Sequence, residues 1–191
     1  LDAVPGDAEL VALCGSLPRG VDESFFAKVI RHHPGRVVVD TSGAALATAV
    51  AAKPWLIKPN REELAELAGR KLPALRDVVD TARKLISSGV GIVVVSLGAD
   101  GALWVDSEMV HHARATVEGP RSTVGAGDCL LAGVLSALVE GHGPATALEH
   151  GVAWGAAAVS LPGSAVPGPA EIDAVRVTSI STPDLDTRLS S

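Results

Sequence analysis

The residues best suited to chemistry form the stretch Thr123–Asp128 (TVGAGD), which an apolar run from Cys129 to Val139 follows. Small residues let backbone N–H groups approach an anion closely, and the start of a helix adds unpaired donors and partial positive charge. An aspartate there can be an ordinary helix N-cap. The alternative is a phosphoryl-transfer site, in which backbone amides hold the moving phosphate and Asp128 accepts the proton of an attacking hydroxyl.

Segments with the pattern of buried strands alternate with helical segments along the chain. Strands are predicted at residues 10–14, 36–40, 55–58, 92–96, 102–105 and 109–113. Helices are predicted at residues 23–33, 44–52, 61–67, 73–88, 126–141, 144–160 and 171–175. This alternation predicts an α/β fold, in which right-handed βαβ units form a mainly parallel central sheet.

Four polar or glycine-rich loops follow predicted strands. They are Gly15–Gly20, Asp40–Gly43, Lys58–Glu63 and Ser96–Gly101. Ligands of such sheets bind outside the carboxyl ends of the strands, so these loops are expected to form a binding rim that faces the Thr123–Asp128 turn.

Composition narrows the class of protein. The 191 residues are 47% hydrophobic and 20% charged, which is typical of one globular domain. A net charge of -6 without a basic cluster argues against a nucleic-acid partner. The apolar runs are shorter than a membrane span, so no membrane association is expected. Cys14 and Cys129 form no disulfide framework or metal-ligand spacing, which favours a cytoplasmic location.

Four separated segments resemble the ribokinase-like (PfkB) family of carbohydrate kinases, and they occur in the order found in that family. They are Gly15–Gly20 (GSLPRG), Lys58–Leu64 (KPNREEL), Ser96–Ala102 (SLGADGA) and Ser122–Asp128 (STVGAGD). The runs Gly69–Pro73 and Gly101–Val105 are most similar to the phosphofructokinase branch. The resemblance extends from about Leu10 to Val175. It implies that residues 1–175 correspond to the C-terminal two-thirds of a kinase domain, followed by a polar tail at 176–191.

The resemblance implies a Rossmann-like three-layer sandwich and a phosphotransferase that uses ATP and Mg²⁺. The expected reaction converts fructose 1-phosphate to fructose 1,6-bisphosphate. Alternatives within the family are kinases for tagatose 6-phosphate, fructose 6-phosphate or a nucleoside. A nucleotide-binding remnant without full activity is an alternative of another class. An NAD-binding domain is disfavoured, because no Gly-x-Gly-x-x-Gly follows the first predicted strand.

The resemblance also assigns roles to individual residues. The general base is Asp128, and the anion hole is formed by Gly125, Ala126 and Gly127. ATP is expected to contact Lys58, Asn60, Ser96, Leu97, Gly98, Ala99, Asp100, Gly101, Thr123 and Gly127. The sugar substrate is expected to contact Gly15, Ser16 and Asp128. Mg²⁺ is expected near Glu63, largely through water. An ordinary aspartate is too weak a base to ionise an alcohol beforehand, so most of the rate must come from positioning and charge stabilisation.

The sequence also departs from the family pattern. Ser122 stands where many members carry Asp. The sequence therefore does not decide whether a monovalent-cation site exists there. The family's sugar-binding acidic residue, glycine-rich sugar loop and β-lid, which occupy roughly its first third, have no counterpart in these residues. We therefore expect the chain alone to bind ATP weakly and to turn over sugar poorly. A homodimer is a possible assembly of the full-length protein.

Overall fold

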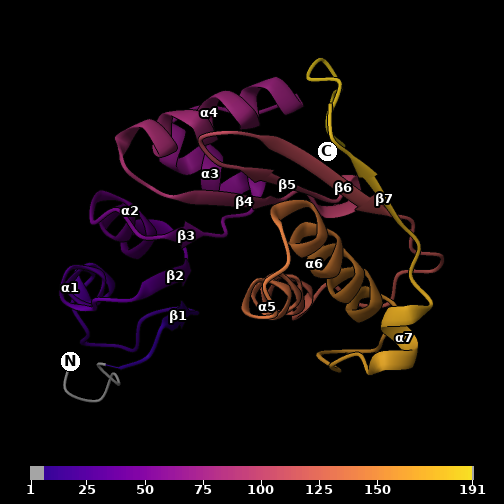
Figure 1. Cartoon of the computed structure of the whole chain (residues 1–191), viewed down its shortest axis with the longest axis horizontal. Helices are drawn as coiled ribbons and strands as arrows, with labels where there is room; N and C mark the ends of the chain where they lie inside the picture. The colour runs from indigo at the N-terminus through magenta and orange to yellow at the C-terminus, as the bar shows by residue number, and fades with distance from the viewer. Residues whose placement is uncertain (1–6, 191) are drawn as a thin grey trace. The chain divides into compact units, whose positions relative to one another are not determined.

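The computed structural model describes residues 7–190, and Figure 1 shows strands alternating with helices along most of the chain. The strands are β1 (Leu10–Cys14), β2 (Arg36–Asp40), β3 (Leu56–Ile57), β4 (Ile92–Ser96), β5 (Ala102–Val105), β6 (Val110–Ala115) and β7 (Val177–Ile180). The α-helices are α1 (Phe25–His32), α2 (Gly43–Ala51), α3 (Arg61–Ala68), α4 (Leu75–Ser88), α5 (Ala126–Val139), α6 (Pro144–Val159) and α7 (Pro169–Asp173). The α/β class expected from the sequence is confirmed.

The sheet is mixed and mostly parallel, with its strands in chain order from β1 to β7. Strands β1 to β4 are parallel neighbours, and their register places Cys14 opposite Asp40 and Val39 opposite Ile57. β6 and β7 are antiparallel. The parallel strands place their carboxyl ends, and the loops that follow them, at one edge of the sheet.

The chain divides into two compact units. The first comprises Leu1–Val95, Val105–Met109 and Leu185–Arg188. The second comprises Ser96–Trp104, Val110–Asp184 and Leu189–Ser191. Thus β1 to β3 and α1 to α4 belong to the first unit, whereas α5 to α7 and β6–β7 belong to the second.

The core of the first unit is built from β-branched strands and amphipathic helices. Val37, Val38 and Val39 in β2 are at most 3% exposed. β-Branched side chains suit such strands because their restricted rotamers pack well on a pleated surface. α3 and α4 both end at a glycine in the left-handed conformation, Gly69 and Gly89. The end of α4 at Ser88 is where the sequence predicts it.

The second unit depends on close packing of α5 against α6. A Cβ atom at Gly133 would lie 2.7 Å from the carbonyl oxygen of His150, and one at Gly151 would lie 2.8 Å from that of Leu130. Real Cβ atoms do not approach a backbone so closely. Glycine at these positions therefore allows the two helices to approach each other closely.

Several predicted boundaries shift in the structure. α1 begins at Phe25, because the Asp22 carboxylate accepts hydrogen bonds from the backbone and hydroxyl of Ser24 in a turn that precedes the helix. The last predicted helix, at 171–175, instead spans Pro169–Asp173. Proline suits this first helical position, since its missing N–H would have no intrahelical acceptor.

The segment after residue 175 contains structure that the sequence did not predict. β7 pairs with β6 from His112↔Ile180 to Ala115↔Val177. Further along, the amides of Leu75 and Arg76 donate to the carbonyl oxygens of Thr187 and Leu185. Residues 185–188 therefore satisfy donors at the beginning of α4, which has no side-chain cap.

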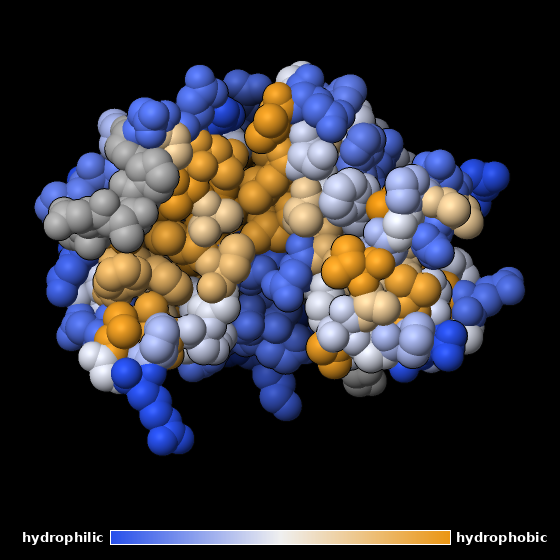
Figure 2. Space-filling view, turned by 90° about the horizontal axis from the view of Figure 1, so that it is seen from below, coloured by the Kyte–Doolittle hydropathy of each residue, from blue (hydrophilic) through white to orange (hydrophobic). Residues whose placement is uncertain are grey.

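Hydrophobic residues reach the surface on the face seen from below, while mostly hydrophilic residues surround them (Figure 2). Val124, Val139 and Val166 are each more than 60% exposed. β1 is the first strand of the sheet, and its residues are only half-buried or exposed. No helix in the described part of the chain is long and apolar enough to span a membrane.

Candidate active site

Asp128 lies in the first turn of α5, and its side chain is exposed. Within residues 7–190 no hydrogen bond or ion pair engages its carboxylate. The N-terminal amides of a helix favour a negative charge in the first turn. Asp128 thus keeps an accessible carboxylate beside backbone donors, which is the arrangement that a proton acceptor in phosphoryl transfer requires.

The turn before Asp128 depends on a left-handed glycine. Gly125 is the N-cap of α5 with φ 79°, a conformation that costs an L-residue roughly 1–2 kcal/mol. The amide of Ala126 donates to the carbonyl oxygen of Thr123 at 3.3 Å, a long bond that closes the turn. The expected anion hole included this amide. In the structure Ala126 is engaged locally, whereas the next amide, that of Gly127, lies in the helical turn whose donors lack intrahelical acceptors.

The C-terminal half of α6 supports this turn. The amides of Arg121 and Ser122 donate to the carbonyl oxygen of Val159 at 2.9 and 3.3 Å. A Cβ at Gly155 would lie 3.2 Å from the carbonyl oxygen of Ala126, which is a tight contact. The turn and the start of α5 are therefore positioned through backbone contacts.

The Ser96–Gly101 segment also belongs to the second unit, where it forms a short 3₁₀ helix, Gly98–Asp100. The amide of Leu97 donates to the carbonyl oxygen of Gly101 at 2.8 Å. Gly101 has φ 88°, and a Cβ there would lie 2.1 Å from the carbonyl oxygen of Ala113, so no other residue fits. The predicted turn is confirmed, and its proposed contact with a nucleotide stays a prediction.

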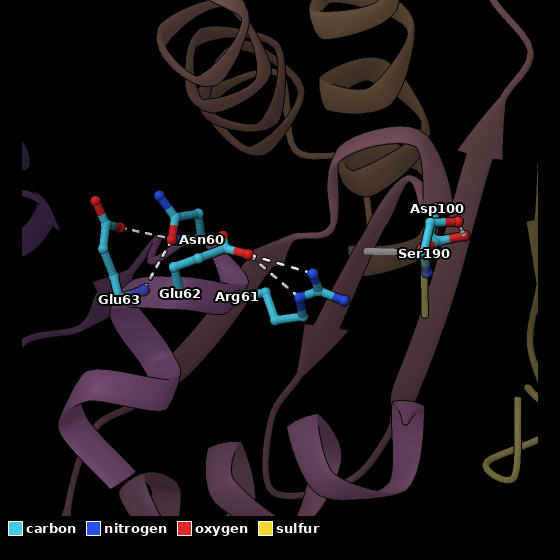
Figure 3. Close-up of polar contacts among 6 residues, drawn as sticks. All are labelled: Asn60, Arg61, Glu62, Glu63, Asp100 and Ser190. Atoms are coloured by element: carbon cyan, nitrogen blue, oxygen red, sulfur yellow. Dashed lines mark hydrogen bonds and ion pairs between the residues drawn. The ribbon is translucent and has the colours of Figure 1, made fainter. Parts of the chain in front are cut away.

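Two contacts that the sequence did not indicate hold Asp100. The Nε2 of His112 lies 2.7 Å from the carbonyl oxygen of Asp100, and His112 is 6% exposed. The Asp100 carboxylate accepts hydrogen bonds from the amide and the hydroxyl of Ser190, at 2.7 and 3.2 Å (Figure 3).

In the first unit, Lys58 follows β3 and is almost fully buried. Its Nζ lies 3.1 Å from Oδ2 of Asp40, at the end of β2, and the two side chains are 6% and 15% exposed. Its backbone amide donates to the carbonyl oxygen of Val39 at 3.0 Å. Lys58 was expected to be a cation at a strand end, and the structure adds the carboxylate that compensates its charge.

The loops after β1 and β2 are joined by two hydrogen bonds. The amide of Gly15 donates to the carbonyl oxygen of Asp40, and the hydroxyl of Thr41 donates to that of Gly15, both at 2.8 Å. Thr41 is 6% exposed, whereas Ser16 is exposed. The structure therefore brings Gly15, Asp40 and Lys58 together at the carboxyl ends of β1 to β3.

Asn60 and Glu63 form a capping box at the start of α3 (Figure 3). The Oδ1 of Asn60 accepts from the amide of Glu63 at 2.8 Å, and the Oε2 of Glu63 accepts from the amide of Asn60 at 2.9 Å. Both residues thus have a structural role at the start of α3. Oε1 of Glu63 has no hydrogen bond to the described residues, so it is available to a water of a hydrated ion.

The residues present fit Mg²⁺ as an outer-sphere partner and not as a protein-enclosed ion. No group of three His, Cys, Asp or Glu side chains in the described part of the chain could hold a metal. Mg²⁺ characteristically keeps several waters and uses one or two carboxylates together with substrate phosphates. The single available oxygen of Glu63 agrees with that mode.

Cys129 lies next to Asp128 but is poorly suited to a reaction. Burial raises the pKa of its thiol, and the nearby Asp128 carboxylate raises it further. A thiol is nucleophilic only as the thiolate, which a raised pKa depletes. The surroundings of Cys129 therefore do not favour a nucleophilic role for its thiol.

The chain belongs to the pfkB family of carbohydrate kinases, whose model matches residues 2–171. The family defines the class of protein: a kinase domain of the α/β type, with a glycine-rich turn and an aspartate at the start of a helix. Among curated proteins, 1-phosphofructokinase of Haemophilus influenzae is 42% identical over 156 residues, which are 80% of this chain and 50% of that protein. The chain thus spans about half the length of the relatives it matches.

Solved structures agree with this assignment. Phosphofructokinase-2 from Escherichia coli, in complex with substrates and products, has a TM-score of 0.80 and 36% identity, over 86% of this chain and 55% of that one. Ribokinase from Thermotoga maritima has a TM-score of 0.73 at 21% identity, over 91% of this chain and 59% of that one, and shows the fold alone. The ribokinase-like fold class is confirmed.

Proposed function

We propose that this chain supplies the catalytic and nucleotide-binding part of an ATP-dependent kinase that converts fructose 1-phosphate to fructose 1,6-bisphosphate. The observation that carries the proposal is the accessible carboxylate of Asp128, which has no bonded partner among residues 7–190 and lies three residues after the left-handed Gly125 at a helix N-terminus. Membership of the pfkB family and the likeness to 1-phosphofructokinases support the reaction and the choice of sugar.

In the proposed mechanism the sugar hydroxyl lies against Asp128, which accepts its proton as the new P–O bond forms. The bond between the terminal phosphorus of ATP and the bridging oxygen breaks, and ADP leaves. The amides of Gly125 and Gly127 at the start of α5 stabilise charge on the transferred phosphoryl group. The ammonium of Lys58 binds ATP phosphate oxygens, and the Ser96–Gly101 turn contacts the nucleotide. Bound Mg²⁺ would neutralise phosphate charge, with Glu63 holding one of its waters.

The proposed partners are a sugar phosphate and ATP, with contacts from Gly15 and Ser16 to the sugar. We further propose a cytoplasmic location and a homodimer as the assembly of the full natural polypeptide. A solved structure of Escherichia coli phosphofructokinase-2 is described as a tetrameric inhibited form, which supports an assembly of some kind in this family.

The experiment that tests the function is an assay of ADP release with the full natural polypeptide. The acceptors are fructose 1-phosphate, fructose 6-phosphate, tagatose 6-phosphate and a nucleoside, each with MgATP. We expect kcat/KM to be highest for fructose 1-phosphate. A higher value for another acceptor would assign a different kinase of the family, and ATP binding without turnover of any acceptor would indicate a nucleotide-binding remnant.

A further inference from the structure

The pair formed by Asp40 and Lys58 is the feature of the first unit that the proposed roles do not yet explain. The two charged atoms, Lys58 Nζ and Asp40 Oδ2, are 3.1 Å apart. The side chain of Lys58 is 6% exposed and that of Asp40 is 15% exposed. The other ion pairs among residues 7–190 have more exposed side chains. In the Lys28–Asp22 pair, for example, the atoms are 4.0 Å apart and the side chains are 52% and 71% exposed.

Backbone hydrogen bonds fix both partners before their side chains meet. The carbonyl oxygen of Asp40 accepts from Gly15, and the amide of Lys58 donates to Val39, the residue before Asp40. Parallel pairing of β2 with β3 sets the register between them. The pairing of the strands therefore places the Lys58 ammonium and the Asp40 carboxylate next to each other.

A buried ion pair is a poor means of stabilising a fold. The cost of removing two charges from water often exceeds their attraction, and apolar pairs of similar size are frequently as stable or more stable. This pair lies at the carboxyl ends of parallel strands, where ligands of such sheets bind. Its position favours a role toward a ligand over a role in the core.

We propose that Asp40 is a positioning residue for Lys58, whose ammonium it holds at the strand ends in the orientation needed to meet nucleotide phosphates. This inference rests on the proposed function, in which Lys58 binds ATP. Without the carboxylate, a charged Lys58 would remain buried and uncompensated, so its long flexible side chain would turn toward water. A phosphate contact would then have to reorder the side chain at each binding event.

The contact itself is tested by amine labelling of the full natural polypeptide under native conditions, with peptide mass spectrometry as the readout. In the unaltered protein Lys58 should react more slowly than the exposed Lys28. Asp40→Asn should increase labelling of Lys58 severalfold and leave Lys28 unchanged, whereas Asp40→Glu should largely retain protection. Equal labelling of Lys58 in the unaltered protein and in Asp40→Asn would overturn the proposal.

Its use in catalysis is tested by a double-mutant cycle on kcat/KM for MgATP with Asp40→Asn, Lys58→Met and the double variant. If Asp40 acts through Lys58, Asp40→Asn should lower kcat/KM by up to about 10²-fold in the presence of Lys58, mainly through KM, and by far less in the Lys58→Met background. Equal factors in both backgrounds would overturn the positioning role. Partial recovery in Asp40→Glu would support it.

The matched control is Asp22→Asn, which removes the carboxylate of the exposed Lys28 pair in the same unit. We expect its kcat/KM to equal that of the unaltered protein. Urea unfolding of every variant separates loss of folded protein from loss of positioning, because misfolding would lower the active fraction equally in both Lys58 backgrounds. If the unaltered protein phosphorylates no acceptor, the proposed function fails, and the labelling result still decides whether Asp40 holds Lys58.

Discussion

The polar residues at the strand ends of the first unit are bonded to one another, whereas the glycine-rich turn of the second unit is held through its backbone. Lys58 pairs with Asp40, and Asn60 pairs with Glu63. By contrast, Asp128 is exposed and has no bonded partner in the described residues, and the Gly125 turn before it depends on a left-handed φ. In the first region, side chains are held in place by one another before any ligand binds. In the second region, the backbone donors are held in place and one carboxylate remains accessible.

This difference separates two kinds of sensitivity. Where side chains satisfy one another, removing a partner exposes an unpaired group and affects stability as well as ligand binding. Where the backbone determines the shape, a functional side chain can be replaced at little cost to the fold, while an added Cβ at a glycine is costly. Each prediction below assigns one substitution to one of these classes.

The largest expected effect is that of Asp128→Asn in the full natural polypeptide. Loss of the proton acceptor should lower kcat by about 10²–10⁴-fold. Because Asp128 has no bonded partner in the part of the chain that the structure describes, the free energy of unfolding should change by less than about 1 kcal/mol, the size of a helix-dipole term. The ADP-release assay and urea unfolding measure the two quantities. Asp173→Asn, an exposed aspartate of the same unit, is the control, and an unchanged kcat would show that Asp128 is not the base.

The contact between α5 and α6 is tested by Gly151→Ala. The new Cβ would lie 2.8 Å from the carbonyl oxygen of Leu130 and 2.5 Å from Cγ2 of Val134. We expect the free energy of unfolding to fall by about 1–3 kcal/mol, although alanine is the better helix former. Urea unfolding measures it.

Gly143→Ala, at the N-cap of the same helix, serves as the control for this overpacking. A Cβ there meets nothing within 4 Å, so we expect a smaller loss. If Gly151→Ala and Gly143→Ala lowered the free energy of unfolding equally, the close approach of the α5 and α6 backbones would not explain the loss in Gly151→Ala.

The sequence predicts local features well, because their causes are local. The helix start at Asn60, the glycine stop at Gly89 and the turn at Ser96–Gly101 each depend on a few neighbouring residues, and the structure confirms all three. The site residues Asp128 and Lys58 were found in the same way, through short motifs with a family resemblance. Their roles stay predictions.

The features that the sequence did not predict depend on contacts between distant residues. β7 is a four-residue strand in a polar segment, and it exists because β6 offers it an edge. The Asp40–Lys58 pair and the contact of His112 with Asp100 each join residues from different parts of the chain. The sequence shows Asp40 as a polar residue at the end of a predicted strand, but the distance between Asp40 and Lys58 along the chain does not predict that the two residues pair.

The capping box of the first unit provides a test of intermediate size. Asn60→Ala removes the acceptor for the amide of Glu63, so the free energy of unfolding should fall by about 1 kcal/mol. If the Oε1 of Glu63 also holds a water of MgATP, KM for MgATP should rise in the same variant. Glu62→Gln, an exposed neighbour, is the control for both measurements. An unchanged stability would contradict the expectation that these side chains fix the strand end in advance.

The smallest effect concerns an ion pair on the surface of the first unit. The hydrogen bond from Arg70, with Nη1 2.7 Å from Asp77 Oδ1, is the main cause that lowers the pKa of Asp77 below its usual 3.8. A depressed pKa in the folded state adds stability above the unfolded pKa, and this stability disappears as the pH falls through the folded value. Both side chains are partly exposed, so solvent screening limits the contribution to about 1 kcal/mol or less. Asp77→Asn should therefore lower the free energy of unfolding slightly at pH 7. The difference should disappear at acid pH, where the protonated Asp77 carboxyl is as neutral as the asparagine that replaces it. A difference that persisted in acid would contradict a role for the charge of Asp77 and would leave hydrogen bonding as the way in which this pair stabilises the first unit.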